Sequence, residues 1–241
     1  MDWNWQVIFD HIPDLMGGAV LTIQLVVISG IVGLFFGLIL ALLRLSKSWL
    51  VQILPFLYIF FFRGTPLLVQ IFLIYYGLGQ FGAVRESFLW EPVLSQAYWC
   101  AIIAFTLNTS AYLAEIIRGA IQTIPVGELE AADALGMSKW QKLTRVTLPR
   151  AFGIVIPAYS NEVIFMLKGS ALASTIALMD ITGVARTISA RTYTLMELFF
   201  AAGIVYLVLS WVILFSFRLF EKRMNRHASY VPPDVVTNTI P

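Results

Sequence analysis

Residue types on which many enzymes depend are scarce in this sequence of 241 residues. One cysteine, Cys100, cannot form an internal disulfide, and two histidines, His11 and His227, argue against a metal site. No lysine follows a glycine, so the Gly-x-x-x-x-Gly-Lys loop that cradles nucleotide phosphates is absent. Without His-Glu-x-x-His, and without a histidine in any apolar run, neither a zinc protease nor a membrane Ser-His dyad fits. We therefore expect no enzymatic activity, no metal and no bound cofactor.

Charged residues are also few. They make up 12% of the chain, against 59% hydrophobic residues and a mean hydropathy of +0.81, a balance typical of membrane proteins. With a net charge of +2 and no basic block, the sequence gives no reason to expect a nucleic-acid partner. The N-terminal sequence MDWNWQVIFDHIPD lacks the basic region of a signal peptide, so we expect the first apolar run to remain as a membrane span.

Five apolar runs reach the roughly 20 residues that a helix needs to cross a bilayer. They cover about 19–43, 51–78, 97–117, 152–176 and 197–220. The sequence therefore predicts an all-α integral membrane protein with five transmembrane helices. Residues 1–226 would form a single membrane domain, and residues 227–241 a disordered tail.

Two of these spans carry features that affect helix packing. Gly30, Gly33 and Gly37 in the first span would let a neighbouring helix approach closely. In the second span, Arg63 places a charge within the apolar run and Pro66 removes a backbone donor. We expect a kink at this point, with the guanidinium buried in the membrane.

A polar stretch, GELEAADALGMSKWQKLTRVTLP at 127–149, separates the third and fourth spans. Its acidic residues come first and its basic residues last, which is the order that a helix dipole favours. Gly136 should permit a bend between two helices, and Pro149 should end the second. Because such a stretch cannot lie in hydrocarbon, we treat residues 118–151 as a polar loop outside the membrane.

The distribution of lysine and arginine orients the spans, because cytoplasmic segments carry the excess. With the N-terminus outside, eleven of these residues lie in the inner segments 44–50, 118–151 and 218–241, and three lie in the outer segments. The other two, Arg63 and Lys168, lie within spans. The charge count therefore predicts that the polar loop and the C-terminus are cytoplasmic.

The polar loop resembles the EAA loop of bacterial ABC importer permeases. RGTPLLVQ at 63–70 and AYLAEIIRGAI at 111–121 look like the polar amino acid branch of that family. PAYSNEV at 157–163 is similar to the permeases of histidine, arginine, lysine and ornithine importers. The loop motif itself is Glu130-Ala131-Ala132, three residues, Gly136, nine residues, and Val146-x-Leu148-Pro149, with valine where isoleucine is usual.

This resemblance implies a type I ABC importer permease fold in a bacterial inner membrane. Its partners would be a cytoplasmic ATPase dimer that binds Mg-ATP, a second homologous permease and an external substrate-binding protein. The substrate would be an amino acid, with a basic side chain. Coupling to the ATPase would involve six residues of the polar loop: Glu130, Ala131, Ala132, Gly136, Leu148 and Pro149.

Glu162, in the fourth span, is the candidate substrate residue. A carboxylate within a span costs on the order of 2.5–3.5 kcal/mol on insertion scales, so it should face a cavity or a cation. A basic amino acid would supply that cation. Ser160 and Asn161 would add hydrogen-bonding groups to the pathway, and Arg63 would orient Glu162 or contact a substrate carboxylate.

Several alternatives remain open on the sequence alone. Glu162 could instead pair permanently with Arg63 or Lys168, although Lys168 lies six residues along, about 240° around a helix. Hydrogen bonding in helix packing is the default role for Asn108, Thr109 and Ser110, with cavity lining as the lesser alternative. Glu115 would support the polar loop. The whole chain could also be an ion-gradient-driven transporter or channel, or a structural membrane protein.

Overall fold

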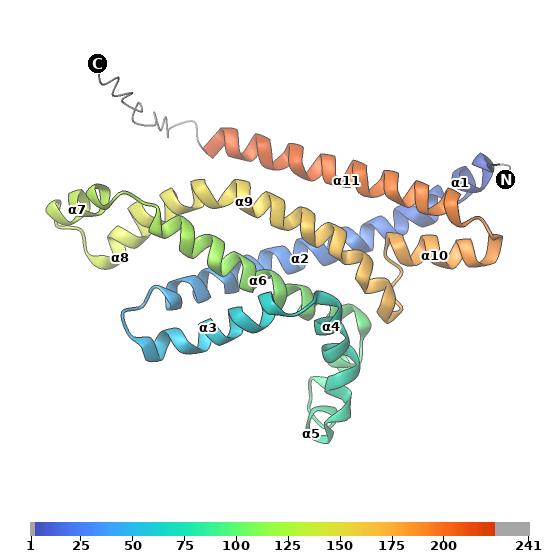
Figure 1. Cartoon of the computed structure of the whole chain (residues 1–241), viewed down its shortest axis with the longest axis horizontal. Coiled ribbons are helices and arrows are strands. Elements are labelled where there is room, and N and C mark those ends of the chain that lie inside the picture. The colour runs from blue at the N-terminus through green and yellow to red at the C-terminus, as the bar shows by residue number, and fades with distance from the viewer. Residues whose placement is uncertain (1–2, 225–241) are drawn as a thin grey trace, which may run out of the picture.

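Every regular element is helical within residues 3–224, which are the residues that the computed structural model describes (Figure 1). α6 lies at the centre, packed against α2 and α9, and more of it is buried than of any other candidate span. The all-α prediction is therefore confirmed. Four long helices run side by side along the molecule: α2 (Ile12–Arg44), α6 (Ala97–Gln122), α9 (Leu148–Gly169) and α11 (Leu195–Met224).

Shorter helices and single turns connect or flank the long ones. Before α6 these are α1 (Trp5–Asp10), α3 (Trp49–Gly64), α4 (Leu67–Phe72), η1 (Leu73–Gly77), η2 (Leu78–Gln80), α5 (Gly82–Arg85) and η3 (Trp90–Leu94). After it come α7 (Val126–Ala134), α8 (Lys139–Lys142), η4 (Leu143–Thr147), η5 (Ser170–Ile176) and α10 (Ile181–Thr192). Elements η1, η3 and η4 are π-helical turns, whereas η2 and η5 are 3-10 helices.

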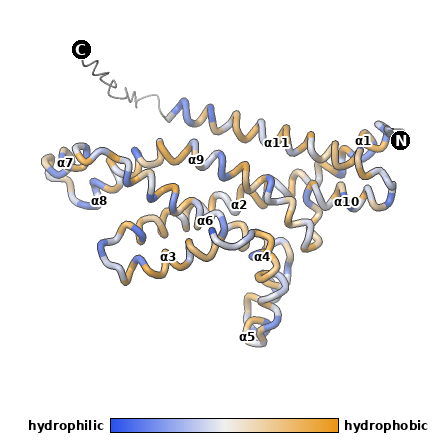
Figure 2. Tube along the Cα trace, in the orientation of Figure 1, coloured by the Kyte–Doolittle hydropathy of each residue, from blue (hydrophilic) through white to orange (hydrophobic). Residues whose placement is uncertain are grey.

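Four helices of the described part are each long and apolar enough to cross a membrane, and they match four of the five predicted spans. Most of their ends lie beyond the predicted bounds: the first span becomes Ile12–Arg44, and the fourth begins at Lys139 instead of about 152. Hydropathy marks only the apolar middle of a helix, whereas backbone hydrogen bonding continues into its polar ends. Figure 2 shows hydrophilic residues near the ends of the long helices, such as the C-terminal end of α11.

The predicted second span, 51–78, is two helices instead of one kinked helix. α3 and the segment Leu67–Gln80 meet at 108°, so α4 and α5 leave the side of the bundle (Figure 1). Pro66 follows the end of α3, and buried Gln70 satisfies carbonyls left free there: its Nε2 donates to Phe62 O at 2.9 Å and to Thr65 O at 3.0 Å. Counted as one broken span, this pair is the fifth.

The close packing predicted for the first span is present between α2 and α6. A Cβ atom on Gly37 would lie 2.8 Å from Leu113 Cβ, and one on Gly33 would lie 3.1 Å from Thr109 Cγ2. Ser29 Oγ also donates a hydrogen bond to the Ile102 carbonyl, at 3.2 Å, across the same interface. The two backbones are therefore so close that larger residues would force them apart.

The polar loop forms one end of the bundle, near the end of α2 and the C-terminal end of α11 (Figure 1). Gly136 has a φ of +71°, a left-handed conformation that glycine adopts without strain, so the predicted bend between α7 and α8 is confirmed. The prediction that Pro149 ends a helix is wrong. Pro149 lies in the first turn of α9, where a proline is tolerated, and the helix continues from α8 through the π turn η4.

Between the fourth and fifth spans, the chain forms an irregular segment and a short helix. η5 ends at Ala177, which has a φ of 64°. Asp180 then caps α10, because its carboxylate accepts hydrogen bonds from Thr182 N at 3.2 Å and Gly183 N at 3.0 Å. α10 lies with α1 at the end of the bundle opposite the polar loop (Figure 1). The predicted tail, 227–241, lies outside the described residues.

Candidate functional site

Glu162 lies in a cavity of about 370 Å³, which we call the glutamate cavity. The Glu162 side chain is the only charged group in its wall, and the residue is 9% exposed. An ionised carboxylate in such apolar surroundings is costly unless a cation joins it. The walls come from α4, α6 and α9: Leu67, Phe105, Asn108, Tyr112, Glu162, Phe165 and Met166.

Within residues 3–224, no side chain forms an ion pair with Glu162 at 4.0 Å or less. Arg63 is near enough to act on it electrostatically but does not contact it. Lys168 is exposed. Neither of the permanent pairs left open by the sequence is present, so this carboxylate is available to a ligand.

The two polar residues that precede Glu162 do not join it in the cavity. Ser160 Oγ donates a hydrogen bond to the Pro157 carbonyl of its own helix, at 2.7 Å, and Asn161 is exposed. Neither lines the glutamate cavity. The reason is helical geometry, because each residue turns about 100° around the axis and adjacent side chains point in different directions.

Two polar residues of α6 line the glutamate cavity beside Glu162 instead. Asn108 and Tyr112 line the cavity, so the structure supports the lesser alternative for Asn108. Asn108 is held by Gln70, whose Oε1 accepts a hydrogen bond from its Nδ2 at 3.0 Å. A sequence signal exists for this face: Asn108, Tyr112 and Glu115 lie four and three residues apart, and all three are partly exposed on a helix that is otherwise largely buried.

A second cavity, of about 380 Å³, lies between α2, α3 and α6. We call it the arginine cavity, because Arg44 and Arg63 lie in its wall together with Glu115. Tyr112 lines both cavities, and the Arg63 guanidinium lies 5.3 Å from the centre of its ring. Arg63 thus belongs to this cavity and not to the one that holds Glu162. It is exposed in this chain, so the predicted burial of its guanidinium is wrong.

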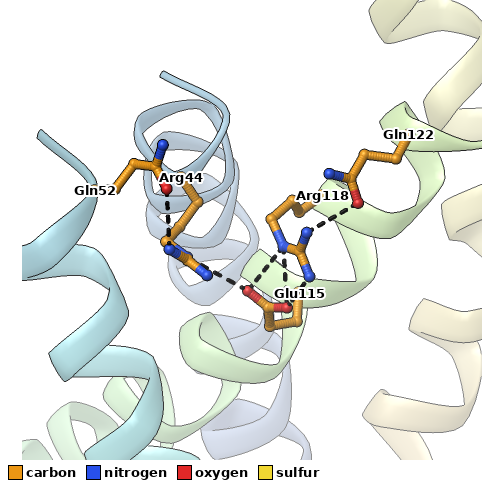
Figure 3. Close-up of polar contacts among 5 residues, drawn as sticks. All are labelled: Arg44, Gln52, Glu115, Arg118 and Gln122. Atoms are coloured by element: carbon orange, nitrogen blue, oxygen red, sulfur yellow. Dashed lines mark hydrogen bonds and ion pairs between the residues drawn. The ribbon is translucent and has the colours of Figure 1, made fainter. Parts of the chain in front are cut away.

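Figure 3 shows the polar contacts beside the arginine cavity. The Arg118 guanidinium binds the Glu115 carboxylate with Nη2 at 2.6 Å and Nε at 3.0 Å from Oε2, and its Nη1 donates to Gln122 at 2.9 Å. Arg44 is further away, with Nε 3.8 Å from Glu115 Oε1, and its Nη1 donates to Gln52 at 3.4 Å. Glu115 therefore forms its ion pairs with Arg118 on its own helix and with Arg44 at the end of α2. Neither partner lies on α7 or α8, so the predicted support of the polar loop is not seen in these contacts.

The predicted coupling residues fall into two groups. Glu130 and Ala131 lie on α7, Ala132 is buried beneath them, and Gly136 forms the bend. Leu148 and Pro149 lie apart from these, in the wall of an apolar cavity of about 530 Å³ beside α9 and α11. Four of the six residues, Glu130, Ala131, Ala132 and Gly136, thus lie on α7 or at the bend that follows it.

Two ion pairs fix the polar loop to the start of the fourth span. Lys142 Nζ lies 2.6 Å from Asp133 Oδ1, which joins α8 to α7. Arg150 Nε donates to Glu128 Oε2 at 2.9 Å, and its Nη2 donates to Oε1. The hydrogen bond from Arg150 holds the pKa of the Glu128 carboxyl below its usual range. Three large apolar side chains of this loop nevertheless remain exposed: Val126, Leu135 and Trp140.

Comparison with known proteins identifies the molecule to which these features belong. Residues 33–226 match the family described as "Binding-protein-dependent transport system inner membrane component". The chain belongs to this family. The permease has a curated relative in the octopine transport system permease protein OccM of Rhizobium radiobacter, 45% identical, over 91% of each chain. The histidine/lysine/arginine/ornithine transport system permease protein HisM of Escherichia coli K12 is 39% identical, over 87% of this chain and 88% of that one.

Among solved structures, the permease is similar to a chain described as "Crystal structure of an amino acid ABC transporter with histidines". The two share 34% identity and a TM-score of 0.82, over 92% of this chain and 100% of the other. The fold is thus that of type I ABC importer permeases, and the protein is a transport permease subunit of an ABC amino acid importer. This finding favours neither an ion-gradient-driven transporter nor a scaffold protein.

Proposed function

We propose that this permease carries amino acids with a cationic side chain. The observation that supports this is Glu162, which is 9% exposed in an otherwise uncharged cavity and has no ion-pair partner among the described residues. The names of its relatives agree: one includes histidine, lysine, arginine and ornithine, and another names octopine. The planar donors of a guanidinium, such as that of arginine, suit a single carboxylate.

The energy for transport would come from a separate subunit. The chain has no glycine–lysine pair, and so no phosphate-binding loop of its own. Glu130 and Ala131 on α7, with exposed Leu135 and Trp140 nearby, form a polar and apolar surface at one end of the molecule. We assign this surface to a cleft on a cytoplasmic ATPase dimer, which binds Mg-ATP.

The remaining partners follow from the type of transporter. A second homologous permease would cover the partly exposed polar face of α6, and an external binding protein would deliver the amino acid in the bacterial inner membrane. From the charge count, the polar loop would lie in the cytoplasm and the α1–α10 end outside. ATP-driven closure of the ATPase dimer would move α7, and through Gly136 and the continuous α8–α9 helix would re-orient the glutamate cavity.

Specificity is tested by uptake into proteoliposomes that contain the complete complex and its binding protein. We expect labelled arginine and lysine to be preferred to glutamine, and Glu162→Gln to lower uptake of the cationic substrates about 10- to 100-fold, because a hydrogen bond to a charged group is lost. Asn161→Ala, a change next to Glu162 but outside the cavity, is the control and should leave uptake unchanged. Equal loss in both variants, or no loss in either, would reject the proposal.

Coupling is tested separately with Glu130→Lys. This change reverses a charge on α7 without touching either cavity. The purified complex should lose its ATPase subunit, or hydrolyse ATP without uptake. Glu197→Lys, at the start of α11 and at the opposite end of the molecule, is a charge-matched control. Transport that continued without any ATPase would refute the whole assignment.

A further inference from the structure

The arginine cavity carries more positive charge than its own side chains neutralise. Glu115 is its only carboxylate, and Arg118 already binds that group at 2.6 Å. Within residues 3–224, Arg44 has no carboxylate nearer than Glu115 at 3.8 Å, and Arg63 forms no ion pair. Two guanidiniums therefore face this cavity with a single carboxylate, which Arg44 shares with Arg118.

Arg44 is also incompletely hydrogen-bonded. Its Nε atom is buried and has no hydrogen-bond partner in the described structure, and its side chain is only 19% exposed. The guanidinium lies 5.1 Å from the centre of the Phe56 ring, which holds its position without supplying an acceptor. A buried donor without an acceptor costs free energy, so the Arg44 guanidinium is held here with incomplete compensation from the protein.

The two cavities are adjacent along one face of α6. Asn108 lines the glutamate cavity, Tyr112 lines both, and Glu115 lines the arginine cavity. From Asn108 to Glu115 the helix advances seven residues, or about 10 Å, toward the polar loop. Arg63 acts electrostatically on both Glu162 and Glu115. The arginine cavity therefore lies next to the glutamate cavity, on the side toward the polar loop.

We propose that the arginine cavity is a second binding site for the transported amino acid, which holds its α-carboxylate against Arg44 and Arg63 and its α-ammonium against Glu115. The proposal rests on the transport function proposed above. Two guanidiniums and one carboxylate complement the two charges that every amino acid carries on its Cα substituents. This site would thus bind the α-carboxylate and α-ammonium that all amino acids share, whereas Glu162 would bind the cationic side chain.

Occupancy of the site can be measured with a thiol placed in its wall. Phe60 lines the arginine cavity and is 70% exposed, so Phe60→Cys in a Cys100→Ser background gives one reactive thiol, which we call the reporter thiol. In the purified complex, saturating arginine should slow labelling of the reporter thiol by a neutral methanethiosulfonate about tenfold. Agmatine, which is arginine without its carboxylate, should not. The expected ratio corresponds to one charge-assisted hydrogen bond.

Three controls make the result specific. Leu54→Cys, also on α3 and 75% exposed but outside the cavity, should label at the same rate with or without arginine. Arg44→Gln should abolish the protection of the reporter thiol by arginine, and Arg44→Lys should restore part of it. Lys47→Gln removes the same charge three residues away, outside the cavity, and should leave the protection intact.

Equal protection by arginine and agmatine, or protection that survives Arg44→Gln, would overturn the second site. So would slow labelling caused by phosphatidylglycerol in nanodiscs without any amino acid, since the cavity would then bind a lipid phosphate. If the reporter thiol is not protected while Glu162→Gln still abolishes the preference for cationic substrates, the second site fails and the proposed function stands alone. If protection depends on the carboxylate but uptake shows no cationic preference, the second site stands and the proposed specificity fails.

Discussion

The glutamate cavity and the arginine cavity share Tyr112 as a wall, but their charged groups are arranged in opposite ways. Glu162 is a single carboxylate with no ion-pair partner within the described residues, in walls that are otherwise uncharged. Glu115 is held by Arg118 at 2.6 Å and approached by Arg44 at 3.8 Å. The first cavity therefore lacks a cation, and the second has more guanidinium groups than its one carboxylate can neutralise. This difference indicates that burial of a carboxylate alone does not mark a substrate group, because its local partners decide whether charge is left for a ligand.

The largest expected effect comes from reversing the charge in the glutamate cavity. Glu162→Arg would place a second guanidinium near Arg63, where like charges in low-dielectric surroundings repel strongly. We expect uptake of cationic amino acids by the reconstituted complex to fall by more than about 100-fold. Asn161→Arg adds the same group one residue away, outside the cavity, and should reduce uptake far less. Comparable losses in the two variants would mean that the cavity has no special role.

A smaller effect is expected from lowering the positive charge around the arginine cavity. Arg118→Gln would release Glu115 to pair with Arg44, which would leave only Arg63 unmatched without changing any cavity-lining residue. Arginine should then protect the reporter thiol at position 60 several-fold less well, because its carboxylate competes with Glu115. Gln122→Ala removes only a hydrogen bond to Arg118 and should preserve the protection. Unchanged protection in Arg118→Gln would contradict the charge balance described here.

Substitution of Tyr112, which lines both cavities, should lower uptake by a moderate amount. Tyr112→Leu removes the ring that lies 5.3 Å from the Arg63 guanidinium, whereas Tyr112→Phe keeps it. Cation–π contacts are worth about 0.5–1 kcal/mol at exposed sites, so Tyr112→Leu should lower uptake about two- to fivefold. Tyr112→Phe should have a smaller effect. If the phenylalanine variant were the more defective, the hydroxyl and not the ring would be the important group.

The smallest effect is expected at the ion pair between Arg150 and Glu128. Arg150 lowers the pKa of Glu128 below its ordinary value of 4.5. A lowered folded-state pKa means that this contact stabilises the loop at higher pH, and is lost as the pH falls through the lowered value. Retention of the ATPase subunit by the purified complex should be constant near neutrality and decline slightly only in acid. Exposed ion pairs contribute little, so Glu128→Gln should remove this pH dependence at small cost to assembly. A decline that persisted in Glu128→Gln would assign it to another group.

Properties that depend on local sequence could be predicted well. Four spans, the bend at Gly136 and the close packing at Gly33 and Gly37 follow from hydropathy, backbone freedom and side-chain size. The spacing of Glu130, Gly136 and Pro149 indicated the family that the comparisons confirm. Pro149 shows the limit of such reasoning: a proline in the first turn of a helix does not end it, and the preceding π turn has no evident sequence signal.

The residues that meet around each charge could not be predicted in this way. Ser160 and Asn161 precede Glu162 in the chain yet point elsewhere, while Asn108 and Tyr112 reach it from another helix. Arg63 was expected beside Glu162, but it lines the neighbouring cavity, at the end of a helix that meets the next at 108°. Composition and spacing determined the membrane class, the spans and the type of transporter, because these depend on residues close together in sequence. The angles between helices decided which carboxylate was left without a partner, because such contacts join residues far apart in the chain.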